Sequence, residues 1–339
     1  MHIEYKEYSK KFNEISSLEE YSLNKLKSIR EDLEKVLNNC DFKDNICVIT
    51  TGSFGRVEAS CESDMDFFII CDTEENKKLI LEKKLEIDNV IKKHVPKNTG
   101  STGTFGNDAI NNIDEITSNI GGQKDSNELL TRRMLFLLEG AYLFNEIKFK
   151  KYRDLLISKY LEPTSGHYLD RYLINDIIRY YRTITTDFQF KVDENDKAWG
   201  LRNIKLKFSR KILYYSGIIS VIHAFIEYSN SSQTKKEILL DVLDKPVMER
   251  TYNILQKYNE LSILDYDINK IFEFYNLFLE EISKKENRDT LEKITKDNRK
   301  NYDIYVKLND KSIFFTEKLY SLTAHIAKKQ NNILEALIF

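Results

Sequence analysis

Residues 46–71 read ICVITTGSFGRVEASCESDMDFFIIC. The two apolar runs in this stretch, 46–49 and 67–71, are short and are bounded by turn signals. Such runs predict neighbouring buried strands rather than helices. A glycine turn, Gly52–Arg56, follows the first run directly. The stretch therefore predicts a strand, a tight turn and a second strand, and the rest of the chain is interpreted around it.

A pair of aspartates, Asp64 and Asp66, stands immediately before the second apolar run. Because side chains alternate along a strand, we expect both aspartates to point the same way and Met65 to point the other way. Two carboxylates on one strand face, beside a glycine turn, suit a divalent metal ion and a phosphate group.

The composition limits the fold classes and functions that fit the chain. The 339 residues suffice for a sizeable core and two domains, and only 3 Pro and 11 Gly favour a mostly helical chain with short connections. The 52 basic and 54 acidic residues give a net charge of −2, which does not indicate a general nucleic-acid binder, although a local basic groove stays open.

We expect a cytoplasmic protein without a membrane partner. The N-terminus lacks the apolar core of a signal peptide, and the longest apolar stretch, 212–226, is too short and too interrupted to span a bilayer. The four cysteines match no zinc spacing, so reduced structural thiols are the favoured interpretation. They are Cys40, Cys47, Cys61 and Cys71.

Apolar residues recur at helical spacing through most of the chain outside 46–71. This spacing predicts one or two helices within 3–38 and further helices at about 73–93, 127–139, 146–161, 167–188, 200–228, 233–260, 266–284 and 305–337. Residues 97–125 are rich in Gly, Ser, Thr and Asn, and we expect a long loop near a functional site, with 112–119 as a possible helix.

The combination of an apolar strand, Thr-Gly-Ser-Phe-Gly-Arg, Ser-Asp-Met-Asp and a second apolar strand resembles the nucleotidyltransferase signature of the DNA polymerase β superfamily. Its fuller form is similar to bacterial nucleotidyltransferases related to PII uridylyltransferase, which are often linked to CBS domains. The close match covers 46–71, and a looser match in element order extends to about 220. The resemblance implies an α+β fold, with a mixed-sheet nucleotidyltransferase domain at 1–140 and a helical, substrate-binding-like domain at 141–339. Boundaries near 125–150 or near 163 fit the pattern.

The resemblance also implies a chemistry. Such enzymes move a nucleoside monophosphate from a nucleoside triphosphate, with ATP the first choice here, to a hydroxyl group. Mg²⁺, or alternatively Mn²⁺, would be held by Asp64 and Asp66. Mg²⁺ prefers carboxylate and phosphate oxygens and keeps several waters, so two aspartates plus substrate suffice to hold it. The acceptor stays open between a protein, a small molecule, a nucleotide and an RNA.

Further residues follow from the same resemblance. Gly52, Ser53 and Gly55 would let the backbone approach the triphosphate, and Arg56 would reach a phosphate or pair with Glu58 or Glu62. The helical domain would contribute cations from a basic cluster, namely Lys205, Lys207 and Arg210. A third carboxylate, which would activate the acceptor hydroxyl, has no obvious strand position; Asp108 is the first candidate, followed by Asp114 and Asp125.

Two other functions remain open from the sequence. The chain would be a nucleotide sensor if the third carboxylate were absent. It would alternatively be a defence-type oligonucleotide synthase or a tRNA-modifying toxin. Near-neutral charge weakly disfavours the tRNA version, because a phosphate-rich partner favours a basic surface.

Overall fold

The structure is a computed structural model that describes residues 3–97, 109–164, 168–195, 198–329 and 333–338, without the side chains of 191–195 and 338. Contacts divide the chain into two compact units. The sheet unit comprises residues 17–163, and the helical unit comprises residues 1–16 and 164–339. The fold belongs to the expected α+β class.

The sheet unit contains a mixed four-stranded sheet with the order β3-β2-β1-β4. Strands β1 (Ile46–Thr50) and β2 (Phe67–Cys71) are antiparallel neighbours, as the two apolar runs predict. Strand β3 (Ile110–Asn112) is parallel to β2, and β4 (Ala141–Phe144) is antiparallel to β1. The sequence pattern did not predict β3 or β4. Every residue of β1 and β2 is buried, because helices cover both faces of the sheet.

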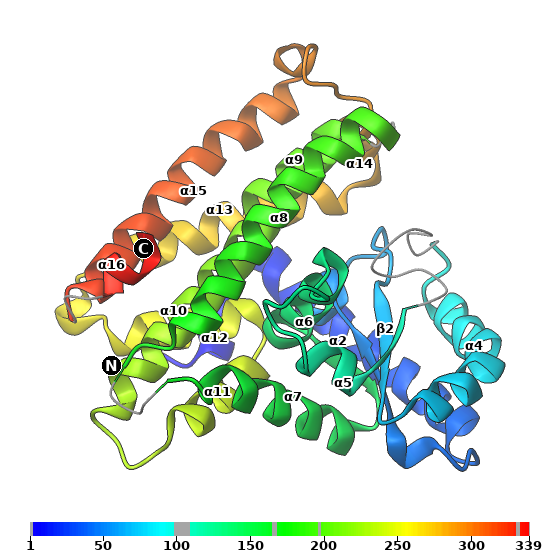
Figure 1. Ribbon diagram of the computed structural model, residues 1–339. Helices are drawn as coiled ribbons and strands as arrows, with labels where there is room; N and C mark the ends of the chain where they lie inside the picture. Colours follow the sequence, from blue (N-terminus) through cyan, green and yellow to red (C-terminus); the bar gives the residue numbers. More distant parts are fainter. Residues whose placement is uncertain (1–2, 98–108, 165–167, 196–197, 330–332, 339) are drawn as a thin grey trace. The chain divides into compact units, whose positions relative to one another are not determined.

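Two long helices pack on one face of this sheet (Figure 1). Alternate strand residues such as Val48 and Ile69 share a hydrophobic core with Leu33 of α2 (Asn13–Leu37) and Ile87 of α4 (Glu74–His94). The intervening strand residues face the other way, where α7 packs on β1 and β4 beside α5 and α6. These helices are α5 (Ile113–Thr117), α6 (Asn127–Glu139) and α7 (Glu146–Leu161).

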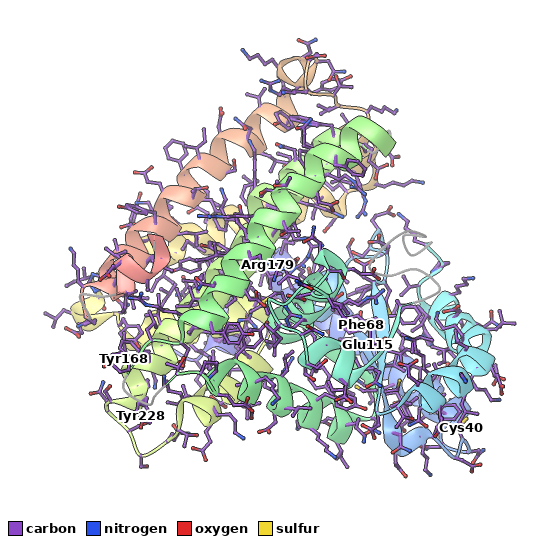
Figure 2. All side chains as sticks on the ribbon, viewed as in Figure 1. Cys40, Phe68, Glu115, Tyr168, Arg179 and Tyr228 are labelled. Atoms are coloured by element: carbon purple, nitrogen blue, oxygen red, sulfur yellow. The ribbon has the colours of Figure 1, made fainter. Side chains whose placement is uncertain are left out.

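Helix α5 begins directly at the end of β3. The Asn112 side chain accepts a hydrogen bond from the Asp114 N–H (2.9 Å), and Glu115 accepts one from the Asn112 N–H (3.1 Å). Figure 2 labels Glu115, which also accepts from Lys77 of α4 (3.2 Å). This capping box fixes where the strand stops and the helix starts.

The helical unit contains α1 (Tyr5–Ser9), the first residues of α2 (13–16) and the helices from α8 onward. Figure 1 labels α8 and most of the helices that follow it. The expected helix at 200–228 contains a π-helical turn, η3 (Leu206–Arg210), which a spacing argument does not detect. The expected helix at 233–260 is broken before Pro246. The elements are α8 (Arg171–Asn195), α9 (Trp199–Lys205), α10 (Lys211–Tyr228), α11 (Lys235–Asp244), α12 (Val247–Lys257), α13 (Asp265–Ser283), α14 (Lys285–Glu292), α15 (Asp303–Ala327) and α16 (Ile333–Ile338).

The first residues of the chain pack in the helical unit. Tyr8 stacks on Tyr252 of α12 with 4.4 Å between ring centroids, and Phe12 lies 5.5 Å from Phe272 of α13. The expected boundary between residues 140 and 141 differs from this division, because it would separate β4 from the sheet in which it pairs. The contacts instead put the boundary between the two units after Pro163, close to the expected boundary near residue 163.

Among the described residues, we find no helix with the length and hydropathy that a membrane span requires.

Candidate active site

The two aspartates, Asp64 and Asp66, lie immediately before the first residue of β2. Met65 between them is fully buried in the sheet core, whereas Asp64 and Asp66 are half-buried, so the alternation expected from the sequence is present. Strand pairing continues to this point, because the Asp66 carbonyl accepts hydrogen bonds from the Thr51 N–H (3.0 Å) and the Thr50 hydroxyl (2.9 Å). The backbone therefore fixes both aspartates beside the end of β1.

Gly52 lies directly beside the Asp66 carboxylate. Its φ of +67° is in the left-handed region, and a Cβ at this position would come within 3.2 Å of Asp66 Oδ2. A larger residue would be strained and would crowd the carboxylate. Gly52 is thus required for this approach of the turn to Asp66.

The glycine turn forms one helical turn, α3 (Gly52–Gly55). The N–H groups of Ser53 and Phe54 lie in its first turn, and the structure records no acceptor for them among the described residues. The hydroxyl of Thr51, the residue before the turn, is buried and also has no hydrogen-bond partner among the residues that the structure describes. Ser53 is half-buried, while Phe54 inserts its ring into the core. Backbone donors at the start of a helical turn are chemically suited to anionic oxygens.

The side chain of Glu139, the last residue of α6, hydrogen-bonds to this turn and to the residue after it. Its carboxylate accepts hydrogen bonds from the Gly52 N–H (2.9 Å) and from Arg56, and Arg56 also donates to Glu58 (2.7 Å). The Glu139 side chain is fully buried, and those of Arg56 and Glu58 are nearly so. The sequence motifs do not identify Glu139. Its position directly after the apolar run 134–138 could have indicated a buried carboxylate, and a buried carboxylate requires partners.

Gly55 and Arg56 both face α6. A Cβ on Gly55 would lie 2.1 Å from the Glu139 carbonyl oxygen, so this glycine allows α3 to pack against the end of α6. Of the roles expected for Arg56, the structure contains the ion pair with Glu58, and Glu62 forms an ion pair with Lys97. Val57 follows with a φ of +60°, which is a strained conformation for a β-branched residue.

The structure describes two of the three candidates for a third carboxylate, Asp114 and Asp125. Asp108 lies outside the described residues, and Asp114 is exposed in the first turn of α5. Asp125 is buried in a bidentate ion pair with Arg133 (3.0 and 3.1 Å) and accepts a hydrogen bond from the Gly121 N–H (2.8 Å). Its oxygens stabilise the connection between α5 and α6, so Asp125 is not suited to the role of a base.

The predicted basic residues Lys205, Lys207 and Arg210 belong to the helical unit, on α9 and the π-helical turn, and all three are half-buried. Lys207 donates to Asn309 of α15, and burial beside Arg299 lowers the pKa of its ammonium group. Lys211, one turn later, donates to Thr316 (2.6 Å), and burial lowers its pKa to about 8. These contacts attach the π-helical turn to α15.

The donor set at the aspartate pair fits a hard cation. Carboxylate oxygens suit Mg²⁺ or Mn²⁺ better than a softer metal, for which cysteine or histidine ligands are typical. The described residues hold no group of three or more His, Cys, Asp or Glu that would bind a metal without help from a substrate. Asp64 and Asp66 would hold the ion together with phosphate oxygens and water.

A scan against models of known protein families finds no match, and a search of curated proteins finds no relative of this chain.

Proposed function

We propose that the chain is a Mg²⁺-dependent nucleotidyltransferase that moves a nucleoside monophosphate from a nucleoside triphosphate, with ATP as the first candidate, to a hydroxyl acceptor. The observation that carries the proposal is the position of Asp66 against Gly52. It brings a half-exposed carboxylate pair next to a helical turn whose Ser53 and Phe54 amides have no acceptor among the described residues. Carboxylates that hold a cation and amides that contact the phosphates both stabilise negative charge during phosphoryl-group transfer.

The residues of the sheet unit have distinct parts in this proposal. Asp64 and Asp66 hold the cation, which, when bound, neutralises charge on the phosphate oxygens. The Ser53 hydroxyl and the amides of Ser53 and Phe54 orient the triphosphate. Glu139 and Arg56 keep the turn in place without contacting substrate. The backbone strain at Val57 supports this assignment, because such strain persists where surrounding contacts enforce it and often accompanies function.

The test is pyrophosphate release by purified protein supplied with each nucleoside triphosphate and Mg²⁺. We expect Asp64→Ala with Asp66→Ala to reduce release at least about a thousandfold, because loss of the cation removes several kcal/mol of transition-state stabilisation. Asp41→Ala with Asp44→Ala is the matched control, since it removes two exposed aspartates elsewhere in the unit and leaves release unchanged. Release by the first double variant at the wild-type rate would refute the proposal.

The acceptor is found by a second measurement. Incubation with labelled ATP, GTP, CTP and UTP, with and without cell lysate, identifies the nucleotide that is transferred and the kind of molecule that receives it. A label on protein, on RNA or on a small molecule distinguishes the three acceptor classes. A label on oligonucleotides alone would instead favour the synthase.

A nucleotide-binding sensor without transfer is the second candidate. The ion pair between Asp125 and Arg133 favours it, because it removes one carboxylate from those able to activate an acceptor. Calorimetry with each nucleoside triphosphate and Mg²⁺ separates the two functions. Tight binding that depends on Asp64 and Asp66, without pyrophosphate release in the presence of lysate, would favour the sensor.

A further inference from the structure

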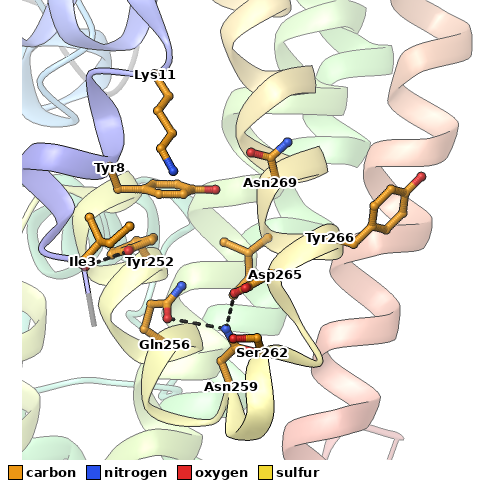
Figure 3. A pocket seen from close by; sticks show the side chains of 11 residues that line it. Ile3, Tyr8, Lys11, Tyr252, Gln256, Asn259, Ser262, Asp265, Tyr266 and Asn269 are labelled. Atoms are coloured by element: carbon orange, nitrogen blue, oxygen red, sulfur yellow. Dashed lines mark hydrogen bonds between the residues drawn. The ribbon is translucent and has the colours of Figure 1, made fainter. Parts of the chain in front are cut away.

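The helical unit contains a surface cavity of about 550 Å³ (Figure 3). It lies between the N-terminal segment, the end of α12, the loop after it and the start of α13. A volume of this size is typical of small-molecule sites, which span roughly 300–1,000 Å³. The proposed transfer chemistry uses none of the residues that line it.

Tyr8 gives this cavity an unsatisfied polar group. Its side chain is only 7% exposed, and its hydroxyl has no hydrogen-bond partner among the described residues. Leaving such a group buried and unpaired costs about 1–3 kcal/mol, so a partner is expected. Figure 3 shows the hydroxyl directed across the cavity toward Asn269. Burial raises the pKa of Tyr8, so the hydroxyl remains protonated and can both donate and accept.

The Tyr8 ring is held rigidly, which fixes the direction of its hydroxyl. Tyr252 stacks on it at 4.4 Å between centroids, and the Lys11 ammonium lies 4.9 Å from the ring centroid. Contacts therefore already engage the ring, and the hydroxyl is the part of Tyr8 that has no hydrogen-bond partner among the described residues. A preorganised hydroxyl of this kind adds affinity at little cost in entropy.

The other polar groups in the cavity lining indicate the chemistry of the ligand. Gln256 and Asn269 present amide groups to the cavity, while Asn259 is fixed in place by Asp265 (2.5 Å) and by the Leu264 N–H (2.7 Å). Among the described residues of the lining, the formal charges are those of Lys11 and Asp265, and they cancel. Amides and a hydroxyl with no net charge match hydroxyl or amide groups on an uncharged molecule, and do not match a polyphosphate.

We propose that this cavity binds a small, uncharged ligand rich in hydroxyl or amide groups, which satisfies the Tyr8 hydroxyl. Two sources share this chemistry, a free nucleoside and a free sugar. The site is separate from the proposed transfer site and does not depend on its activity.

The experiment measures thermal shift and then calorimetric affinity for the full chain. One arm uses adenosine, guanosine, cytidine and uridine, and the other uses ribose, glucose and galactose. We expect at least one compound to raise the melting temperature saturably at millimolar concentration or below. The arm that responds identifies the source.

The decisive variant is Tyr8→Phe, which removes the hydroxyl and keeps the stacked ring. Because it deletes an unpaired buried group, we expect the unliganded protein to be as stable as wild type or more so, while the responding compound binds about tenfold more weakly. Tyr215→Phe is the matched control, since it removes a buried hydroxyl of α10 outside the cavity and leaves affinity unchanged.

Two results would overturn the proposal. One is that no compound in either arm produces a saturable shift, including the case in which only nucleoside triphosphates do so. The other is that Tyr8→Phe binds the responding compound as tightly as wild type. Pyrophosphate release by Asp64→Ala with Asp66→Ala tests residues of the sheet unit, whereas Tyr8→Phe tests a cavity of the helical unit. Failure of either proposal therefore does not decide the other.

Discussion

Among single residues, Glu139 connects the glycine turn to the rest of the sheet unit. One carboxylate accepts from the Gly52 amide and from the Arg56 guanidinium, and all three groups are buried. A buried ion pair contributes little to net stability compared with a well-packed apolar core, but loss of one partner leaves the other charge without compensation. The conformation of the turn beside Asp66 thus depends on a residue more than 70 positions further along the chain.

We predict that Glu139→Ala lowers the free energy of unfolding by about 3–5 kcal/mol, because Arg56 and the Gly52 amide lose a buried acceptor. Urea denaturation of wild type and variant measures the difference. Glu162→Ala serves as the control, since it breaks an exposed pair with Lys159 and should cost less than about 1 kcal/mol. Equal effects of the two substitutions would contradict the structural importance assigned to Glu139.

At the scale of elements, apolar periodicity locates the longer helices well. The expected helices at 127–139 and 146–161 agree with α6 and α7, because each has a clear start signal in Ser126 or Asn145 and an end marked by Gly140 or the approach to Pro163. Strands β3 and β4 escaped prediction since they are only three and four residues long. Their pairing partners, rather than local sequence, determine them.

The packing of α10 on α12 makes stability depend on pH. His223 of α10 is buried, and its Nδ1 lies 2.8 Å from the Tyr258 hydroxyl at the end of α12. Burial, assisted by Lys257 and opposed by Glu227, lowers the pKa of His223 from 6.5 to about 4. The unfolded chain therefore binds this proton more readily between pH 6.5 and 4, so stability is lost as the pH falls through that range.

We predict that His223→Gln abolishes this contribution, because glutamine can bond Tyr258 but does not titrate. Between pH 7 and pH 4, wild type should lose on the order of 3 kcal/mol more unfolding free energy than the variant. Urea denaturation across this range measures the difference, and His325→Gln on α15 is the control. Parallel pH profiles for wild type and His223→Gln would show that the buried imidazole is not responsible.

At the scale of the whole molecule, the sequence predicts the centre of the candidate site better than its surroundings. Asp64, Asp66 and Gly52 lie within 15 residues of one another, so strand alternation and turn chemistry suffice to associate them. Glu139 and the Tyr8 cavity depend on contacts between distant parts of the chain. Periodicity cannot show that the Tyr8 hydroxyl has no partner among the described residues.

The division into units predicts the effect of an N-terminal deletion. Removing residues 1–12 deletes Tyr5, Tyr8 and Phe12, which pack with Tyr252 and Phe272. We expect faster hydrogen exchange in α12 and α13, while β1 and β2 keep their protection.

Mass spectrometry of the exchanged peptides measures this outcome. Deletion of 333–339 is the control, because it removes α16, which packs on α15, and keeps Tyr5, Tyr8 and Phe12. Equal loss of protection in the sheet unit after the N-terminal deletion would show that the first residues also support the sheet.

The membership of α1 in the helical unit also has a consequence for the order of events during synthesis. Tyr8 emerges from the ribosome 244 residues before its stacking partner Tyr252. At roughly 5–20 residues per second, this separation corresponds to on the order of 10–50 seconds. The whole sheet unit is made during that interval and is free to fold first. The aromatic segment around Tyr8, translated before the sheet unit, is therefore among the last parts of the chain to reach its native contacts.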